Sequence, residues 1–304
     1  MRIPLLLAAL LTAFALIASA CGDSNNGTTG AGGSPTAIPL SNEGITPIAA
    51  NSELAVGPNR FGLGLIDEDN KPILDAPGTS VALKFYYQDK LKSQADARFV
   101  WAIPDVAGLF VADVEFDQAG TWEAEATLTQ SGDETKVRRF NFPVLAQGRA
   151  PTIGGKAPPS ENLTINDVSD IAQISTDETP NTAFYQMTVA QALEAGKPFV
   201  VIFATPKFCQ TRFCGPILDN IKAIAPDFAD QVTFIHIEPY ELDANGDLVV
   251  GSDGFPKPVQ ATSDWGLISE PWIFVVDAAG TVTARFEGAA SPAELSAAIQ
   301  PLVP

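Results

Sequence analysis

Short hydrophobic runs separated by turn residues dominate residues 51–147. Hydrophobic and polar positions alternate within these runs, which is typical of strands that bury one face. Pro77-Gly78 and Ala119-Gly120 are turn sequences that separate them. The pattern predicts strands at 61–66, 81–87, 110–116, 121–128 and 137–144. Strands at this spacing predict a small antiparallel sandwich as a first, all-β domain.

Residues 161–304 alternate strand and helix patterns instead. Thr188 and Gln191 form a capping-box sequence that predicts a helix to Ala195. Ser291-Pro292 with Glu294 predicts the start of a last helix. The intervening pattern predicts strands at 199–204, 232–237, 272–276 and 281–286, a helix at 216–228 and a helix-like segment at 262–267. This order predicts a second domain of the α/β class, ending in a hairpin and a helix.

The N-terminus carries the pattern of an export signal. Arg2 is followed by the apolar stretch Pro4–Ile17 and by the small residues Ala18-Ser19-Ala20. The stretch is short for a membrane helix, which needs about 20 apolar residues. Residues 1–20 are therefore predicted to be a signal peptide. Glycine, serine, threonine and proline are frequent in residues 21–50, which predicts a flexible tether.

Glycine and proline also fill residues 148–160, which we expect to link the two domains. The chain carries 36 acidic and 18 basic residues, a net charge of -18. This charge repels phosphate backbones, so we expect no nucleic-acid partner. The residues indicate no cofactor.

The segment around Cys21 resembles a bacterial lipoprotein signal, in which the cysteine after the small residues is lipidated. Ala18 departs from that pattern, because Leu, Val or Ile is more usual there. The resemblance implies that Cys21 is a lipid anchor on the extracytoplasmic face of the cell membrane. Cleavage after Ala20 without lipidation, which would give a secreted protein, is the alternative.

The strand sequence that begins at Val111, followed by Ala119-Gly120 and Trp122, resembles immunoglobulin-like sandwiches of the YtkA-like kind. The resemblance implies an immunoglobulin-like sandwich over residues 51–147. This stretch holds no cysteine or histidine. We therefore expect it to be a spacer or docking module.

Cys209 and Cys214 lie between a predicted strand and a predicted helix, where a helix N-terminus lowers a thiol pKa. Lys207 and Arg212 lie close to Cys209, and no acidic residue lies between Ala195 and Leu218. We expect Cys209 to be the nucleophile, Lys207 and Arg212 to favour its thiolate, and Cys214 to be the resolving cysteine. On a regular helix, residues five apart have Cα atoms roughly 8–9 Å apart, beyond the ~7 Å limit for a disulfide. The pair is therefore expected to lie partly in a loop.

Three features resemble the thioredoxin-like superfamily: the cysteine pair after a strand, Glu270-Pro271 before the strand at 272–276, and the hairpin turn Asp277–Gly280. The resemblance implies a thioredoxin fold, with Pro271 in a cis peptide that faces the cysteines. It also implies thiol–disulfide exchange with exported protein thiols and disulfides and with a redox donor protein. No carboxylate lies in 199–204, where the family often keeps one for proton transfer. Glu270 is the substitute we expect.

The four residues between the cysteines leave other functions open. The spacing is similar to that of Q-type peroxiredoxins, which implies peroxide reduction at Cys209. A Sco-like Cu(I) carrier using Cys209, Cys214 and His236 is a further alternative. His236 lies in an apolar run, where a packed core residue is the more usual interpretation. A purely structural disulfide is the last alternative.

One more segment has a possible ligand pattern. Asp243–Asp247 resembles half of a calcium loop. It lacks the glutamate that would close an EF-hand site. We expect a plain loop there, in an insertion at 239–261 that serves as a lid or partner contact.

Overall fold

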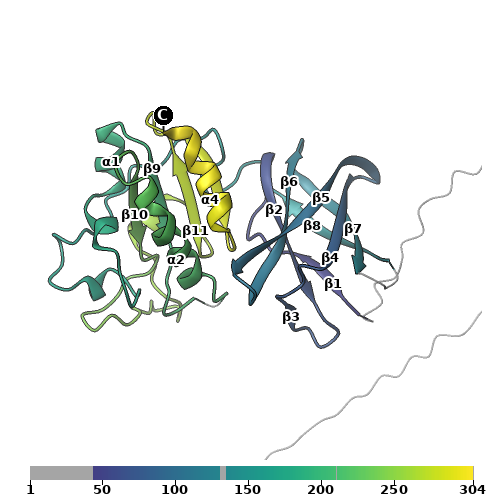
Figure 1. The fold of residues 1–304 in the computed structure, drawn as a ribbon, viewed down its shortest axis with the longest axis horizontal. Helices are drawn as coiled ribbons and strands as arrows, with labels where there is room; N and C mark the ends of the chain where they lie inside the picture. The colour runs from purple at the N-terminus through teal and green to yellow at the C-terminus, as the bar shows by residue number, and fades with distance from the viewer. Residues whose placement is uncertain (1–43, 131–134, 210, 304) are drawn as a thin grey trace, which may run out of the picture. The chain divides into compact units, whose positions relative to one another are not determined.

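The structure, a computed structural model, describes residues 44–130, 135–209 and 211–303 (Figure 1). The predicted signal peptide, Cys21 and most of the tether lie outside the described residues and stay predictions. Thr46–Ala49, which we expected in the tether, instead form strand β1 and pair with β2. The described residues hold together as one compact unit, so the domain boundary expected at 148–160 also stays a prediction.

Residues 46–144 form an antiparallel sheet of eight strands in the order β1-β2-β6-β5-β4-β7-β8, with β3 beside β2. The strands are β1 Thr46–Ala49, β2 Gly57–Ile66, β3 Pro72–Ile73, β4 Thr79–Tyr87, β5 Lys90–Ile103, β6 Ala107–Phe116, β7 Gly120–Gln130 and β8 Lys136–Val144. The all-β expectation is confirmed. The strands join one continuous, barrel-like sheet through β5, and the finer expectation of a sandwich stays a prediction.

Strand β5 makes the sheet continuous. Its residues 90–97 pair with β4, and its residues 98–103 pair with β6. The sheet thus bends around one core, which draws on strands from both halves, including Phe61, Phe85, Phe116, Trp122 and Phe142. The sequence pattern missed β5 because its first half, Lys90–Ala97, is mostly polar and partly exposed.

A second sheet has four strands in the order β10-β9-β11-β12. They are β9 Phe199–Phe203, β10 Thr233–Ile237, β11 Trp272–Val276 and β12 Val282–Glu287. β9 and β10 run parallel, while β11 is antiparallel to both β9 and β12. Every residue of β9 and β11 is buried, which explains why their uninterrupted apolar runs were easy to find in the sequence.

Helices cover both faces of this sheet. α2 (Cys214–Ile224) and α4 (Pro292–Ile299) pack on the face that carries Val200 and Ile202, and Figure 1 shows them side by side over the strands. α1 (Val189–Ala195) and α3 (Gln260–Asp264) pack on the opposite face. Short 3-10 helices occur at Ile171–Gln173, Thr182–Tyr185, Ala225–Asp227 and Gln300–Leu302. None of the helices in the described part of the chain is long and apolar enough to cross a membrane.

Both predicted helix starts are confirmed. Thr188 and Gln191 close a capping box at α1, and Ser291 and Glu294 close one at α4. Gly196 ends α1 in the left-handed region with φ 60°, which a side chain disfavours. The capping boxes and Gly196 explain why the first residues of α1 and α4 and the last residue of α1 could be predicted from the sequence.

The insertion after β10 folds back on itself. Tyr240 bridges to Pro258, Leu242 to Leu248 and Val250 to Pro256. The Asp243 carboxylate accepts hydrogen bonds from the backbone amides of Asn245 (2.8 Å) and Asp247 (3.0 Å). Asp243 therefore closes its own turn, as expected for a plain loop.

Candidate functional site

Cys209 and Cys214 form a disulfide, with 5.9 Å between their Cα atoms. Cys209 lies in the loop after β9, and Cys214 is the first residue of α2. Arg212, between them, adopts a left-handed backbone with φ 63°. The loop thus shortens the distance that a regular helix would leave between the two cysteines, as the spacing predicted. The helix begins two residues earlier than expected, so Cys214 belongs to it.

The two sulfurs of this disulfide are not equivalent. Cys214 is completely buried, whereas Cys209 is partly exposed. The Cys209 Sγ accepts a hydrogen bond from the Cys214 backbone amide at 3.3 Å and contacts the Thr211 hydroxyl at 3.2 Å. The N-cap residue Phe213 makes no side-chain capping bond, and the Cys209 sulfur satisfies one of the free N–H groups at the start of α2 instead. The same two donors would stabilise a thiolate on Cys209 once the disulfide opens.

Lys207 and Arg212, the two basic residues near the disulfide, differ in their partners. The Lys207 ammonium donates to the Asp247 carboxylate at 2.8 Å and lies 4.9 Å from the Phe208 ring centroid. Asp247 thus compensates the charge that we expected Lys207 to offer to Cys209. The Arg212 side chain is exposed on the loop between the cysteines. Of the two expected thiolate-stabilising residues, only Lys207 forms an ion pair with another described residue.

Pro271 follows a cis peptide bond with Glu270. β11 begins at the next residue, and Trp272 pairs with Phe203 at the end of β9. The register therefore brings Pro271 to the end of the sheet from which the cysteine loop leaves. The Glu270 carboxylate, which we expected to act in proton transfer, accepts a hydrogen bond from the Tyr240 hydroxyl at 2.7 Å.

Glu238 is a buried carboxyl that the sequence reasoning missed. It follows β10, whose last residue Ile237 pairs with Phe203, so Glu238 lies at the same end of the sheet as the cysteine loop. Its Oε2 accepts hydrogen bonds from the Thr176 amide (3.0 Å) and hydroxyl (2.8 Å). Thr176 Oγ1 in turn accepts the Lys207 amide at 3.2 Å, which connects Glu238 to the cysteine loop.

The second oxygen of Glu238 faces the buried Thr205 hydroxyl, and neither atom has another hydrogen-bond partner among the described residues. Burial raises the pKa of Glu238 to about 7, and the negative charge of Glu270 adds to the rise. The only sign of this carboxyl in the sequence is that Glu238 is the first polar residue directly after the apolar run 234–237.

His236 is a packed core residue. Its Nε2 donates to the Ala204 carbonyl at 2.9 Å, so its Nδ1 accepts from the Tyr185 hydroxyl at 2.6 Å. Burial lowers the pKa of His236 to about 4, which keeps it neutral. Both ring nitrogens are therefore engaged, and a Cu(I) site would have to break one of these bonds. The described residues contain no group of three or more metal-binding side chains.

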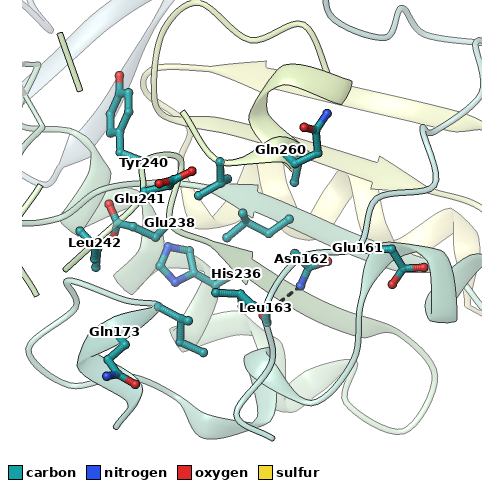
Figure 2. A pocket seen from close by; sticks show the side chains of 14 residues that line it. Glu161, Asn162, Leu163, Gln173, His236, Glu238, Tyr240, Glu241, Leu242 and Gln260 are labelled. Carbon is teal, nitrogen blue, oxygen red and sulfur yellow. Dashed lines mark hydrogen bonds between the residues drawn. The ribbon is translucent and has the colours of Figure 1, made fainter. Parts of the chain in front are cut away.

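A pocket of about 350 Å³ lies beside Glu238 and His236. Figure 2 shows these two side chains next to each other at its wall, below Tyr240 and Glu241, with Glu161 on the other side. Neither cysteine lines it. The pocket is therefore separate from the disulfide.

No protein-family model matches the chain, and no curated protein matches it. One similar solved structure is a thiol:disulfide interchange protein of the thioredoxin family from Chlorobium tepidum TLS; it is 15% identical, with 52% of this chain and 99% of that chain covered and a TM-score of 0.32. Another is a DUF4426 family protein from Pseudomonas aeruginosa PAO1, 12% identical, with 34% of this chain and 91% of that chain covered and a TM-score of 0.25. At these TM-scores neither likeness bears on the function.

Proposed function

We propose that this protein is an extracytoplasmic thiol–disulfide oxidoreductase of thioredoxin-like fold, held at the membrane by a lipid on Cys21. The observation that carries the proposal is the asymmetric disulfide. Cys209 is open to attack by a partner, whereas Cys214 is buried at the start of α2 and can react only within the molecule. This division is what a nucleophilic and a resolving cysteine require.

The arrangement of the surrounding elements supports the thioredoxin-like part of the proposal. A central strand, β9, leads into the cysteine loop, and a helix leaves from the second cysteine. The strands β11 and β12 form the terminal hairpin, and the cis peptide before Pro271 stands at its entry. These are the features that the resemblance in the sequence implied.

The exchange reaction balances without a cofactor. In the reduced protein, the Cys209 thiolate attacks one sulfur of a substrate disulfide, and the other substrate sulfur leaves as a thiolate that takes up a proton. Cys214 then loses its proton and attacks the Cys209 sulfur, which releases the second substrate thiolate. Two electrons have passed to the substrate, and the Cys209–Cys214 disulfide is restored. A dithiol of a donor protein returns the pair to the reduced state.

The test uses the full mature chain with Cys21→Ser, so that no lipid is attached. We expect this protein to catalyse insulin reduction by dithiothreitol, and Cys209→Ser to abolish the catalysis. The reduction potential of the cysteine couple then decides whether the protein acts as an oxidant or a reductant. A disulfide that reforms readily while no substrate is exchanged would identify a structural bond and refute the proposal.

The same preparation tests the two other functions. Rapid peroxide consumption by the reduced protein without insulin reduction would favour a thiol peroxidase. A stoichiometric Cu(I) complex that His236→Ala abolishes would favour the carrier.

The anchor is tested in a bacterial host. We expect the full precursor to be labelled by a radioactive fatty acid and to sediment with membranes. Cys21→Ala should prevent the labelling and release the mature chain. Release of the unmutated protein would favour the secreted alternative.

A further inference from the structure

A cleft of about 530 Å³ is lined by sequence neighbours of both cysteines, although neither cysteine itself lines it. Pro206 and Lys207, before Cys209, form one wall, and Gly215, the neighbour of Cys214, forms another. A Cβ built on Gly215 would lie 4.0 Å from the Pro206 Cβ, so the loop and the helix start meet at this edge. Ligand pockets commonly have about this volume. The cleft can therefore hold the chain that flanks a substrate cysteine.

The rest of the cleft is lined by two threonines, Thr176 and Thr179, and by three carboxylates: Asp177, Glu178 and, from α2, Asp219. The Lys222 ammonium contacts the carboxylates of Asp177 and Asp219, each at 2.8 Å. The single positive charge of Lys222 therefore compensates only one of the two negative charges of Asp177 and Asp219.

Glu178 adds a further charge. It is exposed, and none of the residues that the structure describes pairs with it. Together with the shared Lys222, this leaves two negative charges uncompensated at the cleft. The Lys207 ammonium at the opposite wall is neutralised by Asp247.

We propose that this cleft selects cationic polypeptide segments, so that the disulfides exchanged at Cys209 are those with a lysine or arginine close to the substrate cysteine. The inference rests on the exchange reaction proposed above and names its substrate class. It adds a role for Glu178 and Asp219 as specificity-determining residues. Neither residue takes part in sulfur chemistry.

The distances set where the basic residue must lie. Gly215 is about 3.8 Å from Cys214 between Cα atoms, and Asp219 lies about 6 Å further along the helix axis. An extended substrate advances about 3.3 Å per residue. A lysine two or three residues from the substrate cysteine therefore reaches the carboxylates.

The positive charge of Arg212 opposes the selection of cationic substrates. Arg212 is exposed on the loop between the cysteines and attracts anionic substrates. Its effect competes with that of Glu178 and Asp219, and the test separates them.

The probes are three disulfide-linked peptide dimers that differ only two places after the cysteine, where they carry lysine, glutamine or glutamate. With the full mature chain at low salt, we expect kcat/KM for the lysine peptide to exceed that for the glutamine peptide about fivefold. High salt should reduce the preference.

The double variant Glu178→Gln with Asp219→Asn should make kcat/KM for the lysine and glutamine peptides equal. The control variant, Glu68→Gln, removes an exposed carboxylate from a turn of the eight-stranded sheet and should keep the preference.

The outcomes separate this inference from the exchange itself. Equal kcat/KM for the three peptides, or a preference for glutamate that Arg212→Gln removes, overturns the cationic selection and leaves the exchange intact. A lysine preference that survives in the double variant overturns the role of the cleft. Exchange of none of the peptides overturns the exchange and the selection together.

Discussion

Glu238 offers a quantitative check on the electrostatics at the end of the second sheet. Its side chain is 4% exposed, and burial raises its pKa to about 7 from an ordinary value of 4.5. The groups that face it are the Glu270 carboxylate and the hydroxyls of Thr176 and Thr205. In the substitution Glu238→Gln, the amide oxygen can keep the Thr176 hydrogen bonds. The new NH₂ group can donate to the Thr205 hydroxyl, which faces this side chain.

The size and sign of the effect follow from proton linkage. Between about pH 4.5 and pH 7, the folded state keeps the Glu238 proton while the unfolded state has lost it. Stability therefore falls as the pH rises through this window, and the full penalty is present above pH 7. The difference between the two pKa values, at ~1.36 kcal/mol for each pH unit, gives a penalty of about 3 kcal/mol. A glutamine side chain cannot ionise, so the variant escapes this penalty.

Urea denaturation of the oxidised protein at several pH values measures the effect. We expect the free energy of unfolding of Glu238→Gln, relative to that of the natural protein, to increase by about 3 kcal/mol as the pH rises from about 4 to 8.5. Because many other carboxylates titrate, only the difference between the two proteins is informative. Glu68→Gln, at an exposed position, should leave the curve unchanged. Parallel curves for natural protein and Glu238→Gln would show that Glu238 ionises normally and that its surroundings are wetter than the structure indicates.

The site and its scaffold give three more predictions. In the presence of a substrate disulfide, Cys214→Ser should accumulate a mixed disulfide on Cys209, seen as a mass increase that dithiothreitol reverses; an absence of adduct would contradict the assigned roles. Asp247→Asn should free the Lys207 ammonium and lower the pKa of the reduced Cys209 thiol, measured by the pH dependence of alkylation, because a nearby cation favours a thiolate. Thr188→Ala should cost about 1 kcal/mol of unfolding free energy in a denaturant titration, because it removes the side-chain cap of α1.

The parts of the fold that could be predicted from the sequence are those with a single dominant signal. β11 was found with both ends correct, because five consecutive apolar residues are followed by a tight turn. α1 and α4 carry their own capping boxes, so local hydrogen bonding determines their first residues. In each case a short stretch of chain contains all the information needed.

β5 and Glu238 could not be found in this way, because their surroundings come from distant parts of the chain. The polar half of β5 is a strand only because β4 supplies its hydrogen-bond partners. Glu238 looks like the first loop residue after β10, and it becomes buried because Thr176 and Thr205 enclose it. Tertiary contacts outweigh local propensity at both places.

The candidate site was partly predictable. The spacing of Cys209 and Cys214 required a loop, and the loop is present. The ion pair between Lys207 and Asp247 depends on the fold of the insertion, which no local pattern encodes. Charge counted along the chain therefore overstated the positive charge beside Cys209.

The shared strand β5 has a consequence for how the eight-stranded sheet opens. Because one backbone donates to β4 along its first half and to β6 along its second, neither half can lose that strand without disturbing the other. Amide hydrogens of β4 and β6 should therefore exchange with solvent deuterium through a common opening event of equal free energy. Two independent rates there would mean that β5 can break at its middle, near Ala97 and Arg98.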